Sequence, residues 1–236
     1  MPALIAMVGG GIKGAVAAAR YAVDHELVFV HVAHGQAALS RQRAALKNLC
    51  RAYPGARVLA IDIGDARDLG DAGSQVGRRT GQAGREPADD PAGRPGDARG
   101  LLPAILSIGV RHAVRLGAHR VVTGVSQTID EAQRGAAPGE GRPDHRREFI
   151  HAFNIMSQTA LTRRARVVIE APLMDLTYPE VIRLAVRLQV PLEATWTCER
   201  GDPQPCGRCE PCVARSNAFA SAAMTDPLPA ASARIG

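Results

Sequence analysis

Short apolar runs alternate with segments of helical composition at the start of the chain. The apolar runs, which are typical of strands buried in a parallel sheet, are 4–8, 27–32 and 57–63. Helices are predicted between them at 15–19 and 41–52; the second places Ala45, Leu46 and Leu49 on one face. This alternation predicts a βαβαβ unit with parallel strands and right-handed crossovers.

The same alternation continues in the second half of the chain. It predicts helices at 101–117, 147–164 and 178–188 and strands at 120–124 and 167–169. Pro179 suits the first turn of the last helix, where a missing N–H removes no hydrogen bond. The fold class predicted is therefore α/β, with a parallel sheet flanked by helices.

Two segments interrupt the pattern, at about 64–100 and 126–144. Both are rich in Gly and Pro, and the first has almost no large apolar side chain. Such a composition cannot bury enough apolar surface to offset the entropy of ordering, so we expect flexible excursions there. We expect an α/β domain over 1–190 and a small metal-binding region over 191–228.

The composition is that of a soluble globular protein and does not indicate a particular function. The chain has 236 residues, of which 46% are hydrophobic and 22% charged, as in a soluble globular domain. It has no apolar run of 18 residues and no basic leader, so we expect a cytoplasmic protein without a membrane span or signal peptide. The net charge of +6 suits anionic partners, but the basic residues are scattered and aromatic residues make up only 3%, which disfavours a nucleic-acid partner.

Four of the five cysteines fall in one short segment with the spacing C-x7-C-x2-C-x2-C. They are Cys198, Cys206, Cys209 and Cys212. Four thiolates close a tetrahedral shell without an open position, as in a structural Zn²⁺ site. An iron–sulfur cluster is the alternative, although ferredoxin runs place the fourth cysteine downstream, before a proline. Free thiols or disulfides are less favoured in a cytosolic chain.

The C-terminal block carries a resemblance to a known family. Residues 170–228 contain APLMDL, a helix, a VP turn, TWTC, PCGRCEPC, and an Ala-rich helix before DPL. This order closely resembles the end of the 7-cyano-7-deazaguanine synthases, the QueC family of queuosine biosynthesis. His34-Gly35-Gln36 and the block RPDHRREFIHAFN at 142–154 are similar to two further family motifs. The resemblance covers about 200 residues.

The resemblance implies an adenine-nucleotide α-hydrolase-like fold, that of the PP-loop ATPases, with a small zinc-bearing C-terminal region. It implies conversion of 7-carboxy-7-deazaguanine to the nitrile with ATP, Mg²⁺ and ammonium, and a homodimer. The nucleotide would lie on the first strand–helix turn, at Gly9, Gly10, Gly11, Ile12, Lys13 and Gly14. The deazapurine-like substrate would contact His34, Gln36, Asp144 and Glu148. No catalytic residue can be assigned.

Three segments depart from the family pattern. The family turn reads Ser-Gly-Gly-x-Asp-Ser, whereas residues 9–14 have no hydroxyl and place Lys13 at the acid. Pro103 is followed by aliphatic residues where the family has Arg and Asn, and Asp130 opens a poor match to Asp-Tyr-Ser-Gly. The sequence thus leaves three readings open. They are an active synthase, an impaired family-derived binding or partner protein with a degenerate loop, and a PP-loop-like ligase for another substrate. A zinc-ribbon nucleic-acid module is a fourth, weaker reading.

Overall fold

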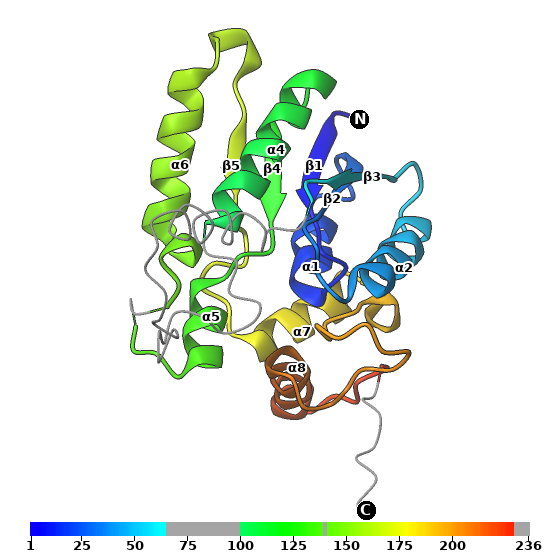
Figure 1. Cartoon of the computed structure of the whole chain (residues 1–236). Coiled ribbons are helices and arrows are strands. Elements are labelled where there is room, and N and C mark those ends of the chain that lie inside the picture. The colour runs from blue at the N-terminus through cyan, green and yellow to red at the C-terminus, as the bar shows by residue number, and fades with distance from the viewer. Residues whose placement is uncertain (65–99, 139–140, 229–236) are drawn as a thin grey trace, which may run out of the picture.

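A computed structural model describes residues 1–64, 100–138 and 141–228 (Figure 1). Five parallel strands form one sheet in the order β3-β2-β1-β4-β5. The strands are β1 Ala3–Met7, β2 Glu26–Ala33, β3 Arg57–Asp62, β4 Arg120–Thr123 and β5 Val168–Glu170. The parallel sheet flanked by helices confirms the predicted fold class.

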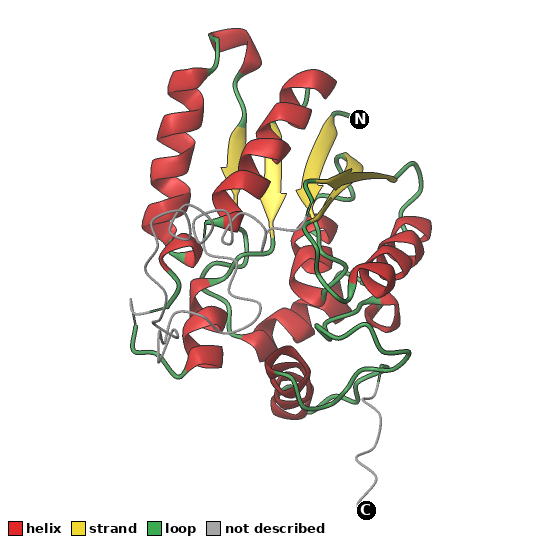
Figure 2. Ribbon diagram, in the orientation of Figure 1, coloured by secondary structure: helices red, strands yellow, loops and turns green. Residues whose placement is uncertain are grey.

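Helices cover both faces of the sheet, as Figure 2 shows. They are α1 Ile12–Ala19, α2 Leu39–Arg51, α4 Leu101–Leu116, α5 Gln127–Arg134, α6 Arg147–Ala160, α7 Tyr178–Arg187 and α8 Glu210–Ser221. Successive side chains of β1 alternate between two cores. Leu4 packs with α1, α2, α7 and α8 on one face, and Ile5 packs with α4 and α6 on the other. Burial on both faces explains why β1 and β2 are continuous apolar runs, whereas the edge strand β3 is mostly exposed.

The strand order reverses direction at β1. The chain leaves β1 toward β2 and β3 on one side, whereas β4 and β5 lie on the other. Met7 at the end of β1 is in register with Val30 of β2 and Thr123 of β4. In open α/β sheets, the crevice at the carboxyl ends of such neighbouring strands is where ligands bind.

The prediction of a flexible loop across 126–144 is wrong in part, because residues 127–134 form α5. Ser126 caps this helix, since its hydroxyl accepts a hydrogen bond from the Ile129 N–H at 3.1 Å. Gly135 ends the helix in the left-handed conformation, with φ of 62°. These are standard start and stop signals. The Gly and Pro residues that suggested a loop gather after Gly135.

The other predicted interruption lies almost entirely outside the described residues, since 65–99 are not described. The division into 1–190 and 191–228 stays a prediction. Leu192 and Phe219, from the second of these parts, pack into the same core cluster as α1 and α7. Within the three described ranges, no helix has both the length and the apolar character that crossing a bilayer requires.

Candidate functional site

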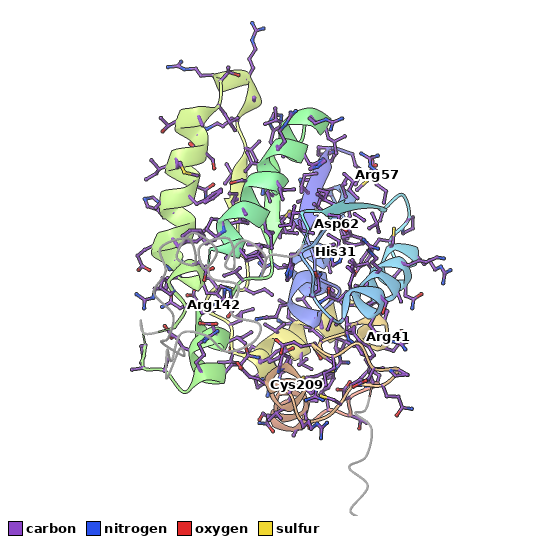
Figure 3. The ribbon with its side chains drawn as sticks, in the orientation of Figure 1. His31, Arg41, Arg57, Asp62, Arg142 and Cys209 are labelled. Carbon is purple, nitrogen blue, oxygen red and sulfur yellow. The ribbon has the colours of Figure 1, made fainter. Side chains whose placement is uncertain are left out.

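A cavity of about 660 Å³ opens at the carboxyl ends of β1 and β4. Its walls come from the turn before α1, from α5, from the segment before α6, and from the cysteine-bearing segment before α8. Figure 3 labels Arg142, near α5 and the start of α6, and Cys209, in the cysteine segment near α8. The residues that line the cavity include Gly9, Gly11, Ile12, Lys13, Gly14, Gln42, Asp130, Arg134, Arg142, His145, Tyr178, Trp196, Glu199 and Glu210.

The turn before α1 exposes backbone N–H groups to this cavity. Gly10 has φ of 85°, a left-handed conformation that favours glycine, and a Cβ there would meet the Gln42 carbonyl at 3.0 Å. Gly11 precedes the first turn of α1, and no side chain caps that turn. The first N–H groups of a helix have no intrahelical acceptor and carry the positive end of its dipole, so the turn suits a phosphate or pyrophosphate group.

Gly124 lets the end of β4 pass directly against this turn. An added Cβ would lie 2.5 Å from the Gly14 nitrogen and 2.6 Å from the Lys13 carbonyl carbon. Both are backbone atoms at the start of α1, so relief would require the helix to shift. The position of the glycine turn therefore depends on a glycine more than a hundred residues away along the chain.

Gly124→Ala is expected to destabilise the protein by about 1–3 kcal/mol, through overpacking of a backbone contact. The midpoint of thermal unfolding should fall by roughly 2–4 °C for each kcal/mol lost. Gly9→Ala is the matched control, because its Cβ would have no neighbour within 4 Å. Equal unfolding midpoints for the two variants would contradict the close approach of β4 to α1.

Asp130 is the structural centre of the cavity's α5 wall. It is buried, its Oδ1 lies 3.1 Å from Arg134 Nε and 3.2 Å from His145 Nδ1, and its Oδ2 accepts the Arg142 N–H at 2.6 Å. Burial alone would raise the pKa of Asp130, but His145, the Arg142 N–H and Arg134 outweigh it and hold that pKa well below its usual range. Asp130 is therefore an ionised carboxylate whose two oxygens both have donors.

Lys13 reaches the same cavity from the first turn of α1. Its side chain is half-buried, and desolvation lowers the pKa of its ammonium below 10.5. The charge of Asp130 opposes this shift, Arg142 adds to it, and Glu210 opposes it. Lys13 is thus a desolvated basic group that lines the cavity, and its contact with a nucleotide phosphate stays a prediction.

The lowered pKa predicts that Lys13 reacts with amine reagents at lower pH than a free lysine side chain. Limited acetylation over a pH series, with Nα-acetyl-lysine as internal reference, would measure this by peptide mass spectrometry. Because only the unprotonated amine reacts, the Lys13 profile should rise at lower pH than the reference. A profile that rises at or above the reference pH would contradict a desolvated ammonium.

The four predicted substrate residues lie next to the cavity wall rather than on it. Gln36 donates to Gln42 Oε1 at 2.8 Å, and Gln36 Oε1 accepts the His34 N–H at 2.7 Å. Asp144 accepts from Arg142 Nε at 3.2 Å. Thus Gln36 and Asp144 each hold a residue that lines the cavity. Their predicted role in substrate binding stays a prediction.

The fourth, Glu148, is exposed near the start of α6 and does not line the cavity. The turn residues behave differently. Gly9, Gly11, Ile12, Lys13 and Gly14 all line the cavity, while Gly10 turns the chain beneath it. The predicted nucleotide-binding residues therefore line the cavity as one segment, whereas none of the predicted substrate-binding residues lines it.

Several lining residues had no sequence signal strong enough to select them. Arg134 lies in the segment predicted to be a loop, and Arg142 and His145 lie in the family-like block 142–154 but were not predicted to be site residues. Tyr178 is predicted from sequence only to begin a helix. Burial raises its pKa to about 12, so its hydroxyl stays protonated and can donate. The arginines would have been found by asking which cations face the turn, which requires the tertiary structure.

Cys198, Cys206, Cys209 and Cys212 converge, with their sulfur atoms all within 4.8 Å of one another. A tetrahedral Zn²⁺ with bonds of about 2.3 Å separates its sulfurs by about 3.8 Å, so small side-chain movements would close the shell. The backbone N–H groups of Arg200 and Cys206 point at the Cys198 sulfur, at 3.4 and 3.5 Å, and such donors stabilise thiolates. These four residues could hold a metal such as zinc.

The cysteine segment also holds the glycine turn. The Trp196 N–H donates to the Gly10 carbonyl at 2.8 Å, and the Trp196 indole donates to the Cys198 carbonyl at 2.8 Å. Trp196 is buried and packs with Cys198 and Cys212, as expected of a residue beneath the metal site. One tryptophan thus connects the cysteine segment to the glycine turn.

Comparison with known proteins agrees with this architecture. The family model described as "Queuosine biosynthesis protein QueC" matches residues 3–223. A 7-cyano-7-deazaguanine synthase of Acidobacterium capsulatum is 29% identical over 229 residues, covering 95% of each chain. The synthase of Chlorobium phaeobacteroides is 28% identical over 232 residues, again covering 95% of each. The match extends over the sheet, the glycine turn and the cysteine segment together, and the chain belongs to the QueC family.

Proposed function

We propose that the protein binds ATP in the cavity at the end of β1 and activates a carboxylate of a deazapurine-like substrate, as a 7-cyano-7-deazaguanine synthase. The observation that carries the proposal is the phosphate-sized surface formed by the free N–H groups of α1 together with Lys13, Arg134 and Arg142. The family match supplies the reaction class. Ammonia would then displace AMP to form the amide, and a second activation would give the nitrile.

The chain's own groups have defined roles in this proposal. The N–H groups at the start of α1 would hold the leaving pyrophosphate, because they are preorganised and need not reorient. Arg134 and Arg142 would bind phosphate oxygens, and Asp130 would hold both arginine-bearing segments in place. Tyr178 would donate a hydrogen bond within the cavity.

We propose Zn²⁺ as the metal of the four cysteines, in a structural role. Four thiolates leave no open position for a water or substrate. The metal would fix residues 198–212, which include the cavity residues Glu199 and Glu210. A homodimer, which the resemblance implies, stays a prediction that analytical ultracentrifugation would check.

A second candidate function is a binding or partner protein that lacks the full reaction. It is favoured by the turn itself, since residues 9–14 offer no hydroxyl or carboxylate and Lys13 points its charge into the cavity. A family protein that lost turnover but kept its fold would retain the cysteine cluster and the glycines. Both are present here.

Turnover by the purified, zinc-loaded protein separates these functions. ATP, Mg²⁺, ammonium and 7-carboxy-7-deazaguanine would be supplied, and AMP and nitrile read by mass spectrometry. Nitrile formation supports the synthase. Absence of AMP from a folded, zinc-loaded sample contradicts it and favours the binding function, whereas AMP formed only with another carboxylic acid points to a different ligase.

A variant carrying Gly9→Ser and Lys13→Asp tests whether the turn limits activity. A Cβ at Gly9 has no neighbour within 4 Å, so serine fits there. Gly14→Ser is left out, because its Cβ would meet Val8 Cγ1 at 3.2 Å and would confuse chemistry with packing. A gain of AMP formation in this variant alone would show that the turn had lost its catalytic groups.

A further inference from the structure

The charges that face the cavity are arranged unusually for a site that takes a metal–nucleotide complex. Among the described residues that line it, the basic side chains are Lys13, Arg134, Arg142 and His145, and the carboxylates are Asp130, Glu199 and Glu210. Lys13 lies in the first turn of α1, and the other three basic residues all contact Asp130 of α5. The start of α1, where phosphate would lie, adds the positive end of its dipole and has no acidic residue in its first turn.

The carboxylate nearest this cluster is not available to a divalent cation. Both oxygens of Asp130 already have donors, Arg134 Nε on Oδ1 and the Arg142 N–H on Oδ2, and His145 Nδ1 lies 3.2 Å from Oδ1. A Mg²⁺ ion prefers carboxylate oxygens and waters in an octahedron, and it would have to displace these donors. Residues 9–14 provide no carboxylate or hydroxyl oxygen either.

The two remaining carboxylates belong to another wall of the cavity. Glu199 directly follows Cys198, and Glu210 directly follows Cys209, so both are carried by the cysteine segment. An ion at the phosphate-binding turn would instead lie beside the ammonium of Lys13. The residues present at the turn therefore do not fit the magnesium ion that the family resemblance implies.

We propose that Lys13 supplies the positive charge that a divalent cation would otherwise bring to the nucleotide phosphates, so that this protein binds nucleotide independently of Mg²⁺. The inference rests on the nucleotide site of the proposed function, but not on its turnover. An ammonium is a compact charge with three donors, which suits a pyrophosphate oxygen. Its half-buried position strengthens the attraction, because the local dielectric is lower than that of water.

Calorimetric titration of the zinc-loaded full chain with ATP, and separately with pyrophosphate, tests this inference. Each titration would be run in Mg²⁺-free buffer without a chelator and with an excess of MgCl2. We expect equal or tighter binding in the Mg²⁺-free buffer, because Mg²⁺ would compete with Lys13 for the same oxygens. Lys13→Met should weaken binding in the Mg²⁺-free buffer by about 10- to 100-fold, the range of a hydrogen bond to a charged group. Lys13→Arg should retain most of the affinity.

Lys47→Met is the matched control, since Lys47 is the only other lysine in the chain and is exposed on α2, away from the cavity lining. It should leave the affinity unchanged. Lys13→Met is expected to remain folded, because an apolar side chain replaces a desolvated ammonium, and its unfolding midpoint would verify this. Lys13→Asp should bind nucleotide only when Mg²⁺ is present.

The outcomes separate this inference from the synthase function. Binding that Mg²⁺ tightens tenfold or more would overturn the inference, even if the protein makes nitrile. Absence of binding in both buffers would overturn the inference together with the nucleotide site. Mg²⁺-independent binding that Lys13→Met abolishes supports the inference, and it does so even if no AMP is formed and the synthase function fails.

Discussion

Removing the proposed Zn²⁺ from Cys198, Cys206, Cys209 and Cys212 is expected to unfold the segment from Trp196 to the start of α8. Little else holds this segment. Its core consists of Trp196 and the cysteines themselves, packed with Ala38, which precedes α2, and Ala45 within α2. A structural Zn²⁺ site contributes apparent binding energies of about 10–16 kcal/mol in small zinc-finger peptides, which is comparable with the whole stability of a domain.

The expected result is a fall of more than about 10 °C in the unfolding midpoint, since one kcal/mol corresponds to roughly 2–4 °C at this chain length. Cys209→Ser should reproduce the effect of a chelator. Cys50→Ser is the matched control, because Cys50 is only partly buried, far from the cluster, with its thiol donating to the Ala56 carbonyl. Metal-free protein that unfolds at the same temperature would show that the cysteines have no structural metal.

Metal loss should also weaken nucleotide binding without any direct contact between metal and nucleotide. The link is Trp196, whose N–H holds the Gly10 carbonyl at 2.8 Å and whose indole is bound to the Cys198 carbonyl. When the segment unfolds, the turn loses this support and the cavity loses the wall formed by Glu199 and Glu210. Unchanged ATP affinity in metal-free protein would contradict this coupling.

The features predicted correctly from sequence are those that depend on short-range pattern. Strands buried on both faces must be apolar along their length, so β1 and β2 could be found from their apolar runs, and the alternation with helices predicted that they and the more exposed edge strand β3 are parallel. The cysteines could be grouped because the spacing C-x2-C-x2-C brings thiols together locally. The glycine turn could be placed because it directly follows a strand and precedes a helix.

The parts that sequence missed depend on contacts between distant segments. Arg134, Arg142 and His145 meet only because Asp130 draws two separate segments together. No periodicity reveals such a contact. Sequence composition predicts a loop where α5 forms, because Gly and Pro are frequent over the whole segment 126–144. The helix start is marked by a single residue, Ser126, whose side chain caps α5. Averages over long windows conceal short elements of this kind.

Arg215→Met is expected to be the most destabilising single substitution outside the metal site. Arg215 is only 3% exposed. Its guanidinium makes a bidentate pair with Asp226 at 2.6 and 2.7 Å, donates to Thr195 Oγ1 at 2.9 Å, and lies 5.4 Å from the Phe219 ring centre. Breaking a buried ion pair by removing one partner costs about 3–5 kcal/mol, because the other charge is left uncompensated.

This network explains why the substitution should act beyond α8. Arg215 lies on α8, Thr195 lies in the segment that leads to Trp196, and Asp226 lies in the C-terminal turn after the helix. One side chain therefore holds three pieces of backbone against one another, and its fork geometry cannot be reproduced by a lysine. The unfolding midpoint should fall by roughly 6–20 °C, at 2–4 °C for each kcal/mol.

Asp226→Asn should lose less than Arg215→Met, because the amide keeps one acceptor for the guanidinium, and the double variant should lose less than the sum of the two single losses. Arg183→Met is the matched control. Arg183 is exposed and donates only to the Ser221 carbonyl, at 3.2 Å, so its replacement should change stability by at most about 0.5 kcal/mol. Additive losses of stability in the double variant would show that Arg215 and Asp226 stabilise the fold separately. Equal unfolding midpoints for Arg215→Met and Arg183→Met would contradict the buried network itself.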